Sequence, residues 1–182
     1  MATAKTKKQP ETTPNVEESA LKELFVDELK DIYWAEKHLS KALVKLAKAA
    51  TSDELRAALE THKAETDNQI TRLEQVFELV EEKAVAKKCD AMDGLIKESE
   101  GIVEDTEDGS ITRDVGIISA AQKSEHYEIA SYGTLRTLAN TLGYTEAAQL
   151  LDETLAEEKK TDELLTQLAE SSINSGAKTE KA

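Results

Sequence analysis

The stretch KSEHYEIASY, residues 123–132, combines the pattern of an amphipathic helix with two acids where apolar residues are expected. At spacings of three and four residues, one face reads Ile118, Ala121, Glu125, Glu128, Tyr132, Leu135, Ala139 and Leu142. This spacing places all eight side chains on the core-facing stripe of a helix. The two carboxylates would therefore point into the core, where each needs a proton, a partner or a cation.

Polar residues interrupt three other apolar stripes, at residues 25–46, 55–76 and 148–168. In each stripe the interruption lies near the middle of the predicted helix, and most of the interrupting residues are acidic. Besides Thr66 and Gln69, the interrupting residues are Glu36, His62, Glu65 (on the shoulder of its stripe), Glu158 and Asp162.

Counting along the chain predicts that these residues share one layer. Within each of two helical hairpins the central acids lie about 15 residues from the turn, which is at Thr51 in the first and at Gly143 in the second. At about 1.5 Å rise per residue, the partners agree in height to within one helical turn. The two hairpins agree with each other only if residues 88–110 cross the bundle, because a connection at one end would offset the acids by roughly 13 Å. We therefore predict the crossing connection.

Buried carboxylates at this density predict a metal site. An ionised and unpaired acid in a dry core costs several kcal/mol, and no Lys or Arg interrupts the same stripes. His62 adds an imidazole to the layer. Carboxylates with imidazole inside a four-helix bundle are typical of di-iron and di-manganese sites. The alternatives for single residues are that His62 is a hydrogen-bonded core histidine, and that Glu125 and Glu128 are solvated acids on a stripe drawn one position off.

The elements that would position this layer follow from capping and turn signals. Asn15 and Thr51 each begin a capping-box pattern, Gly143 is expected to cap a helix, and proline is absent from Asn15 onward. The predicted elements are long helices at about 15–50, 51–87, 113–141 and 145–171, a shorter helix at 89–104 and a loop at 106–112. We predict a disordered N-terminal tail at 1–16, one domain at 17–172 and a disordered C-terminal tail at 173–182.

Composition narrows the class of protein. A third of the residues are charged and aromatic residues are few, which favours long helices over sandwiches or barrels. The net charge of −14 argues against a general nucleic-acid or anionic-membrane surface. The single Cys89 excludes an intrachain disulfide and a multi-cysteine metal site, which favours an intracellular protein. We expect no secretory signal, because the N-terminal residues lack an apolar core, and no membrane span.

Several stretches carry a resemblance to a known family. DIYWAEKHLSKAL, HKAETDNQITRLEQV, AMDGLIKE, AAQKSEHYEIASYGTL and LGYTEAAQLLDETLAEEKKTDELLTQLA resemble the YciE/YciF-like bacterial stress proteins of the ferritin-like superfamily. The similarity covers roughly residues 20–172. It implies an all-α, ferritin-like four-helix bundle with a crossover, a homodimer in the bacterial cytoplasm, and an inferred di-metal site.

The chain departs from the wider superfamily at the ligands. The superfamily usually places Glu-x-x-His on the second and fourth helices, whereas this chain has His62-x-x-Glu65 in the reverse order, and Glu158 followed by Thr161 and Asp162. So little imidazole predicts weaker binding, a preference for manganese, or loss of redox chemistry. The predicted metal residues are Glu36, His62, Glu65, Glu125, Glu128, Glu158 and Asp162.

Roles within this set are assigned as follows. We expect Glu65 and Glu158 to bridge two iron or manganese ions, with Glu36 and Glu128 as terminal ligands. Asp162 has a second interpretation, as the hydrogen-bond acceptor of His62. His38 and His126 fall off the stripes and are predicted to be surface residues.

Two functions remain open at this point. The first is a stress protein whose di-metal site performs oxygen, peroxide or iron redox chemistry, as a peroxidase or ferroxidase does. The second is a non-catalytic dimeric stress protein that acts through its surface and keeps a structural or vestigial metal site.

Overall fold

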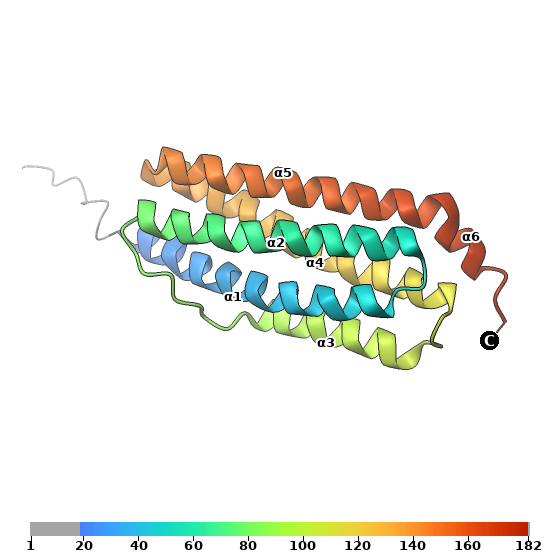
Figure 1. Cartoon of the computed structure of the whole chain (residues 1–182). Coiled ribbons are helices and arrows are strands. Elements are labelled where there is room, and N and C mark those ends of the chain that lie inside the picture. Colours follow the sequence, from blue (N-terminus) through green and yellow to red (C-terminus); the bar gives the residue numbers. More distant parts are fainter. Residues whose placement is uncertain (1–18, 182) are drawn as a thin grey trace, which may run out of the picture.

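The computed structural model describes residues 19–181. The predicted N-terminal tail at 1–16 and the capping box that begins at Asn15 lie outside the described residues. Four long helices form the bundle, and a shorter helix lies alongside it (Figure 1). The elements are α1 (Ala20–Ala49), α2 (Asp53–Leu79), α3 (Asp90–Asp105), α4 (Ile111–Leu142), α5 (Thr145–Leu168), the π-helical turn η2 (Ala169–Ile173) and α6 (Asn174–Ala177).

The four long helices form two antiparallel hairpins, α1–α2 and α4–α5 (Figure 1). α1 packs against α2 and α4, and α5 packs against the same two helices. The segment between the hairpins returns along the length of the bundle, so α2 and α4 run in the same direction. The predicted all-α bundle with a crossing connection is therefore confirmed. No helix in the described part of the chain is both long and apolar enough to cross a membrane.

The turns of both hairpins are held by helix caps, and the first turn also by a long-range contact. Ser52 caps α2 by accepting from the backbone N–H of Leu55. The carboxylate of Asp114, fully buried on α4, accepts from the backbone N–H groups of Thr51 and Ser52, each at 2.7 Å. Gly143 ends α4 at φ 84°, a left-handed conformation that glycine adopts without strain. The turns predicted at Thr51 and Gly143 are confirmed, and Asp114 additionally ties the first turn to the second hairpin.

α2 ends eight residues earlier than predicted, at Leu79 instead of near Lys87. α1 begins at Ala20, so a longer α2 would extend beyond its partner and have no core to pack against. The residues that would continue the helix include Val85, which is 54% exposed. Glu81 turns the chain at φ 58°, and the backbone N–H of Lys87 then donates to the carbonyl of Lys30 on α1. The helix therefore ends where its side chains can no longer be buried, and the helical pattern of residues 80–87 did not reveal this limit.

A chain of hydrogen bonds fastens the crossover to the bundle where α3 begins. The hydroxyl of Tyr127 on α4 donates to Asp31 on α1 at 2.7 Å. The Cys89 sulfur lies 3.1 Å from the same hydroxyl oxygen and accepts from the backbone N–H of Met92. α3 then packs against α4 and α1. These contacts join α1, α4 and the start of α3, where the crossover begins to run along the bundle.

The C-terminal residues differ from the disordered tail predicted at 173–182. Within residues 173–181, Ile173 is 3% exposed and packs into the core. The carboxylate of Glu180 accepts from the backbone N–H groups of Ile111 and Thr112, at 2.7 and 2.8 Å. Free N–H groups at a helix start attract a carboxylate. The segment therefore returns to cap α4, an interaction with no local signal in the sequence.

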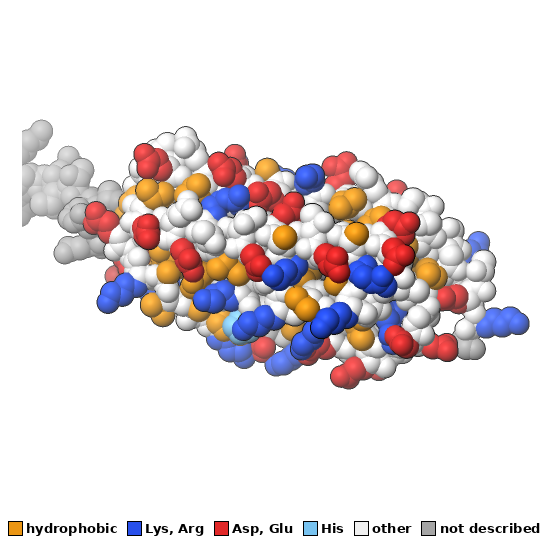
Figure 2. Space-filling view, viewed as in Figure 1, with side chains coloured by type: hydrophobic (Ala, Val, Ile, Leu, Met, Phe, Trp, Pro, Cys, Tyr) orange, Lys and Arg blue, Asp and Glu red, His pale blue; other side chains and the backbone are white. Residues whose placement is uncertain are grey.

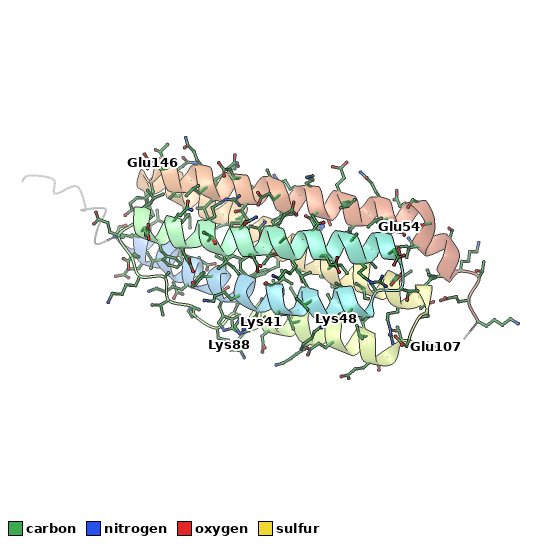
Figure 3. The ribbon with its side chains drawn as sticks, in the orientation of Figure 1. Lys41, Lys48, Glu54, Lys88, Glu107 and Glu146 are labelled. Atoms are coloured by element: carbon green, nitrogen blue, oxygen red, sulfur yellow. The ribbon has the colours of Figure 1, made fainter. Side chains whose placement is uncertain are left out.

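Charged side chains cover the outside of the bundle. Figure 2 shows Lys and Arg side chains gathered along the lower edge of the molecule, over α1 and α3, with acids more widely spread. In Figure 3, Lys41, Lys48 and Lys88 lie at that edge, and Glu54 and Glu146 lie at the periphery on other helices. On this face the positive charge is therefore concentrated over α1 and α3.

Two glycines of α4 should respond in opposite ways to substitution by alanine. A Cβ on Gly116 would lie 2.5 Å from Cγ2 of Ile102, a branched side chain of α3 with little rotamer freedom, whereas a Cβ on Gly133 meets nothing within 4 Å. We expect Gly133→Ala to raise the free energy of unfolding by about 0.5–1 kcal/mol. Gly116→Ala should lower it by about 1–2 kcal/mol through overpacking. Chemical denaturation measures both values, and a gain in both variants would contradict the close approach of α3 and α4.

Candidate metal centre

Five polar side chains from the four long helices meet in the middle of the bundle. They come from α1 (Glu36), α2 (His62), α4 (Glu125 and Glu128) and α5 (Glu158), and each is between 0 and 2% exposed. Four of them, all except Glu36, each offer one ligand atom, and these atoms lie within 4.8 Å of one another. The shared layer expected from helix heights is therefore present for these five residues.

The layer is short of hydrogen-bond partners. Nε2 of His62 lies 3.1 Å from Oε1 of Glu125, but the contact lacks the alignment of a hydrogen bond. With the carboxyl groups ionised, nine buried nitrogen and oxygen atoms in the described residues have no partner: Oε2 of Glu36, both ring nitrogens of His62, Oε1 of Gln69, both oxygens of Glu125 and of Glu128, and Oε2 of Glu158. When protonated, Glu36 and Glu128 can share a hydrogen bond, as can Glu125 and Glu158. Buried polar atoms are rarely left this way, because each costs roughly 1–3 kcal/mol.

Neutral donors hold two of the carboxylates. The hydroxyl of Tyr132 donates to Oε1 of Glu36, and Nε2 of Gln69 donates to Oε1 of Glu158. Gln69 also donates to Glu157, which accepts two hydrogen bonds from the guanidinium of Arg72 at 2.8 and 2.9 Å. The sequence patterns placed Gln69 and Tyr132 on their stripes but gave no sign of these bonds. Both bonds orient a carboxylate and leave its second oxygen free.

Burial and mutual repulsion raise the pKa of every carboxyl group in the layer. Burial raises the pKa of Glu36 to about 8, and the charge of Glu158 acts in the same direction. Burial likewise raises the pKa of Glu125 to about 8. For Glu128 and Glu158, burial and then the neighbouring carboxylates hold the pKa well above its usual range. Without a cation, the acids of the layer therefore carry protons at neutral pH.

Two of the predicted residues lie at the edge of the layer. Glu65 is half-buried on α2 and, like Glu36, is not among the four residues whose ligand atoms lie within 4.8 Å of one another. The side chain of Asp162 is 24% exposed, and its Oδ1 accepts from Nε2 of Gln122 at 3.0 Å. It makes no hydrogen bond to His62, so its alternative role as the acceptor of that ring is wrong in this structure. His126 is 71% exposed on its side chain, as expected of a surface residue.

The donor set fits divalent transition metals. Carboxylate oxygens and imidazole suit iron, manganese and zinc, and the free atoms converge from four helices. No Lys or Arg supplies a hydrogen bond to the five residues within residues 19–181. Four ionised carboxylates carry four negative charges, which two divalent cations would neutralise. The fit therefore rests on charge, donor type and unfilled hydrogen-bond capacity together.

The raised pKa values predict how the stability of the metal-free chain depends on pH. Folded Glu36 and Glu125 keep their protons up to about pH 8, whereas an unfolded glutamate loses its proton near 4.5. The folded state therefore binds more protons in this window, and the free energy of unfolding should fall as pH rises from about 5 to 8. We expect thermal unfolding in the presence of a chelator to shift down by at least about 4 °C over this range.

Glu125→Gln is the variant that isolates this effect. The amide cannot ionise, so the slope of melting temperature against pH should be shallower than in the unmodified chain. Glu60→Gln, at an exposed acid on α2, should leave the slope unchanged. Equal slopes in all three proteins would contradict the raised pKa of Glu125.

Comparison with known proteins places the chain among its relatives. It is 49% identical over 158 residues to protein YciF of Escherichia coli strain K12, across 86% of this chain and 95% of that protein. The crystal structure of the E. coli stress protein YciF matches with a TM-score of 0.82 at 50% identity, covering 86% of this chain and 98% of that one.

Two further solved structures extend the comparison. YcfI of Rhodopseudomonas palustris matches with a TM-score of 0.78 at 38% identity, covering 81% of this chain and 94% of that one. A protein of Xanthomonas campestris pv. campestris matches with a TM-score of 0.69 at 24% identity, covering 88% and 97%, and this likeness concerns the fold alone. The model of the family described as a domain of unknown function (DUF892) matches residues 20–178. The chain therefore belongs to the DUF892 family and is a relative of the bacterial stress protein YciF.

Proposed function

We propose that this chain is a ferritin-like di-metal stress protein that acts in oxygen, peroxide or iron redox chemistry. Glu36, His62, Glu125, Glu128 and Glu158 would hold two iron or manganese ions in the core of the bundle. The homodimer and the cytoplasmic location predicted from the family resemblance belong to the same proposal.

The observation that carries the proposal is the set of unpartnered atoms in the layer. Eight of the nine belong to the five residues that would bind metal, and they face one another from four helices. A protein core that needed these acids only for packing would be more stable with apolar residues of similar volume. These residues could hold cations that would offset this cost, because free carboxylate oxygens and one nitrogen of the imidazole would then have a partner.

The residues of the chain prepare the site in two ways. Tyr132 and Gln69 each fix one oxygen of a carboxylate, which leaves the other oxygen to bind. The carboxyl groups hold protons until a cation displaces them, so binding should release protons and strengthen as pH rises. When bound, a pair of iron or manganese ions supplies Lewis-acid and one-electron redox chemistry toward small oxygen species.

A second candidate function is favoured by the depth of the layer. All five residues are at most 2% exposed, so little surface is open to a substrate. This burial suits a non-catalytic stress protein that acts through its surface, with a metal that only stabilises the fold. Only one imidazole is present among the five residues, which also fits a site without turnover. The two candidates share the metal and differ in what happens when an oxidant is added.

Metal content tests the proposal directly. After treatment with a chelator and loading with Mn²⁺ or Fe²⁺, elemental analysis should find about two ions per chain, as in other carboxylate-rich bundles. Glu36→Gln and Glu128→Gln keep the volume but remove an anionic ligand, so each should lower the content by about one ion or more. Glu60→Gln is the matched control on the surface of α2 and should load like the unmodified chain.

The outcomes separate the candidates. Fewer than about one ion per unmodified chain, or loading unaffected by both Glu36→Gln and Glu128→Gln, would contradict the metal centre. If the redox function is right, peroxide added to the Fe²⁺-loaded chain without air should oxidise the bound iron faster than it oxidises free Fe²⁺ in the same buffer. Iron that loads fully but reacts no faster than free iron would favour the structural role.

A further inference from the structure

One buried atom without a partner lies outside the five residues of the proposed metal centre. It is Oε1 of Gln69 on α2, in a side chain that is 1% exposed. No residue within 19–181 donates a hydrogen bond to this oxygen. A buried amide oxygen without a donor destabilises the fold, and an apolar side chain of similar volume would pack here at no such cost. The oxygen therefore requires a partner that comes from solution.

The carboxylates beside Gln69 fix which end of its amide is free. Nε2 donates to Oε2 of Glu157 at 3.1 Å and also to Oε1 of Glu158. Both oxygens of Glu157 accept from the guanidinium of Arg72, so this carboxylate is an anion. Exchanging the two ends of the amide would place a carbonyl oxygen against that anion instead of a donor. The amide nitrogen therefore faces α5, and Oε1 is the end that remains free.

Arg72 holds this arrangement from the edge of the bundle. Its guanidinium binds Glu157 at 2.8 and 2.9 Å and donates to the hydroxyl of Thr154 at 2.7 Å, and both partners belong to α5. Arg72 and Gln69 are one turn apart on α2, so these contacts fasten α2 to α5 beside the layer. The amide of Gln69 cannot turn without losing hydrogen bonds to charged partners.

The free oxygen lies close to the other candidate ligands. Oε1 of Gln69 is bonded to the same carbon as Nε2, and Nε2 contacts Glu158, one of the four residues whose ligand atoms lie within 4.8 Å of one another. His62, another of the four, precedes Gln69 by two turns on the buried face of α2. Gln69 therefore adds an uncharged oxygen to a group of carboxylates with one imidazole.

We propose that Oε1 of Gln69 is a further ligand of the metal centre, and that it shifts the preference of the centre from Zn²⁺ toward Mn²⁺. This inference rests on the proposed metal centre and adds a ligand and a metal preference to it. Carbonyl and carboxylate oxygens suit manganese, whereas zinc prefers nitrogen or sulfur donors and is satisfied by four ligands. A neutral oxygen therefore stabilises Mn²⁺ more than Zn²⁺ without adding negative charge to the layer. Glu157 and Arg72 are positioning residues for this ligand.

Two metal titrations of the chelator-treated full chain test this role. The electron paramagnetic resonance signal of free Mn²⁺ gives the Kd for Mn²⁺, and competition with a chromogenic chelator gives the Kd for Zn²⁺. Gln69→Met keeps the length of the side chain and removes the oxygen. We expect it to raise the Kd for Mn²⁺ about tenfold and the Kd for Zn²⁺ less than about threefold. Gln75→Met, the same change at an exposed position of α2, is the matched control and should alter neither Kd.

A second variant separates the oxygen of the amide from its N–H groups. Gln69→Glu keeps oxygen donors at this position but cannot donate to Glu157 or Glu158 when ionised, so it tests the ligand without the orienting hydrogen bonds. We expect the ratio of the two Kd values in Gln69→Glu to stay within about threefold of the ratio in the unmodified chain. Thermal unfolding without metal shows whether each variant folds, and if Gln69→Met does not fold, the ratio in Gln69→Glu decides.

The outcomes distinguish the ligand from the centre. If Gln69 only orients Glu158, Gln69→Met should weaken the binding of both ions equally, and Gln69→Glu should lose the preference for Mn²⁺ as well. Either result, or Mn²⁺ binding that is unchanged in Gln69→Met, would overturn the ligand while the metal centre stands. An unmodified chain that binds neither ion would refute the centre and the ligand together.

Discussion

Mutual repulsion among four buried carboxyl groups is the constraint on which the interior of this bundle depends. Glu36, Glu125, Glu128 and Glu158 come from three helices and are fully buried. Each would be costly as an isolated anion, and their proximity makes simultaneous ionisation costlier still. The layer is therefore stable in only two conditions: with protons on the acids, or with cations among them. The metal-free protein and the proposed metal-bound protein correspond to these two conditions.

The residues around the layer allow either condition, protonated acids or bound cations. A lysine or arginine among the acids would neutralise them permanently, and the nearest guanidinium in the network, that of Arg72, is engaged with Glu157. The groups that do contact the layer, Tyr132 and Gln69, are neutral donors. They fix the direction of a carboxylate without supplying charge. These contacts orient the carboxylates, and their negative charge has to be neutralised by protons or by cations from solution.

The bundle positions the layer through contacts at its ends. Asp114 joins the first hairpin turn to α4, and Glu180 caps the start of the same helix. The hydrogen bonds of Tyr127 with Asp31 and Cys89 hold the crossover against α1 and α4. These contacts fix the height of α4 relative to α1 and α2. Because α4 supplies two of the carboxylates, the geometry of the layer depends on that height.

Residue patterns alone predict the four long helices, both hairpin turns, the direction of the crossover and the presence of an acidic layer. These features follow from local rules: apolar residues repeat with the period of a helix, a capping pattern begins at Thr51 (one residue before the Ser52 cap), Gly143 suits a helix end, and residue counts give heights. Which residues of the layer contact one another depends instead on how the helices pack. Glu65 was predicted on the shoulder of its stripe and Asp162 within its stripe, yet both are half-buried, because a small rotation of a helix separates burial from exposure. The end of α2 and the return of Glu180 to α4 were likewise decided by non-local packing, because a segment's own residues do not reveal where its neighbours begin.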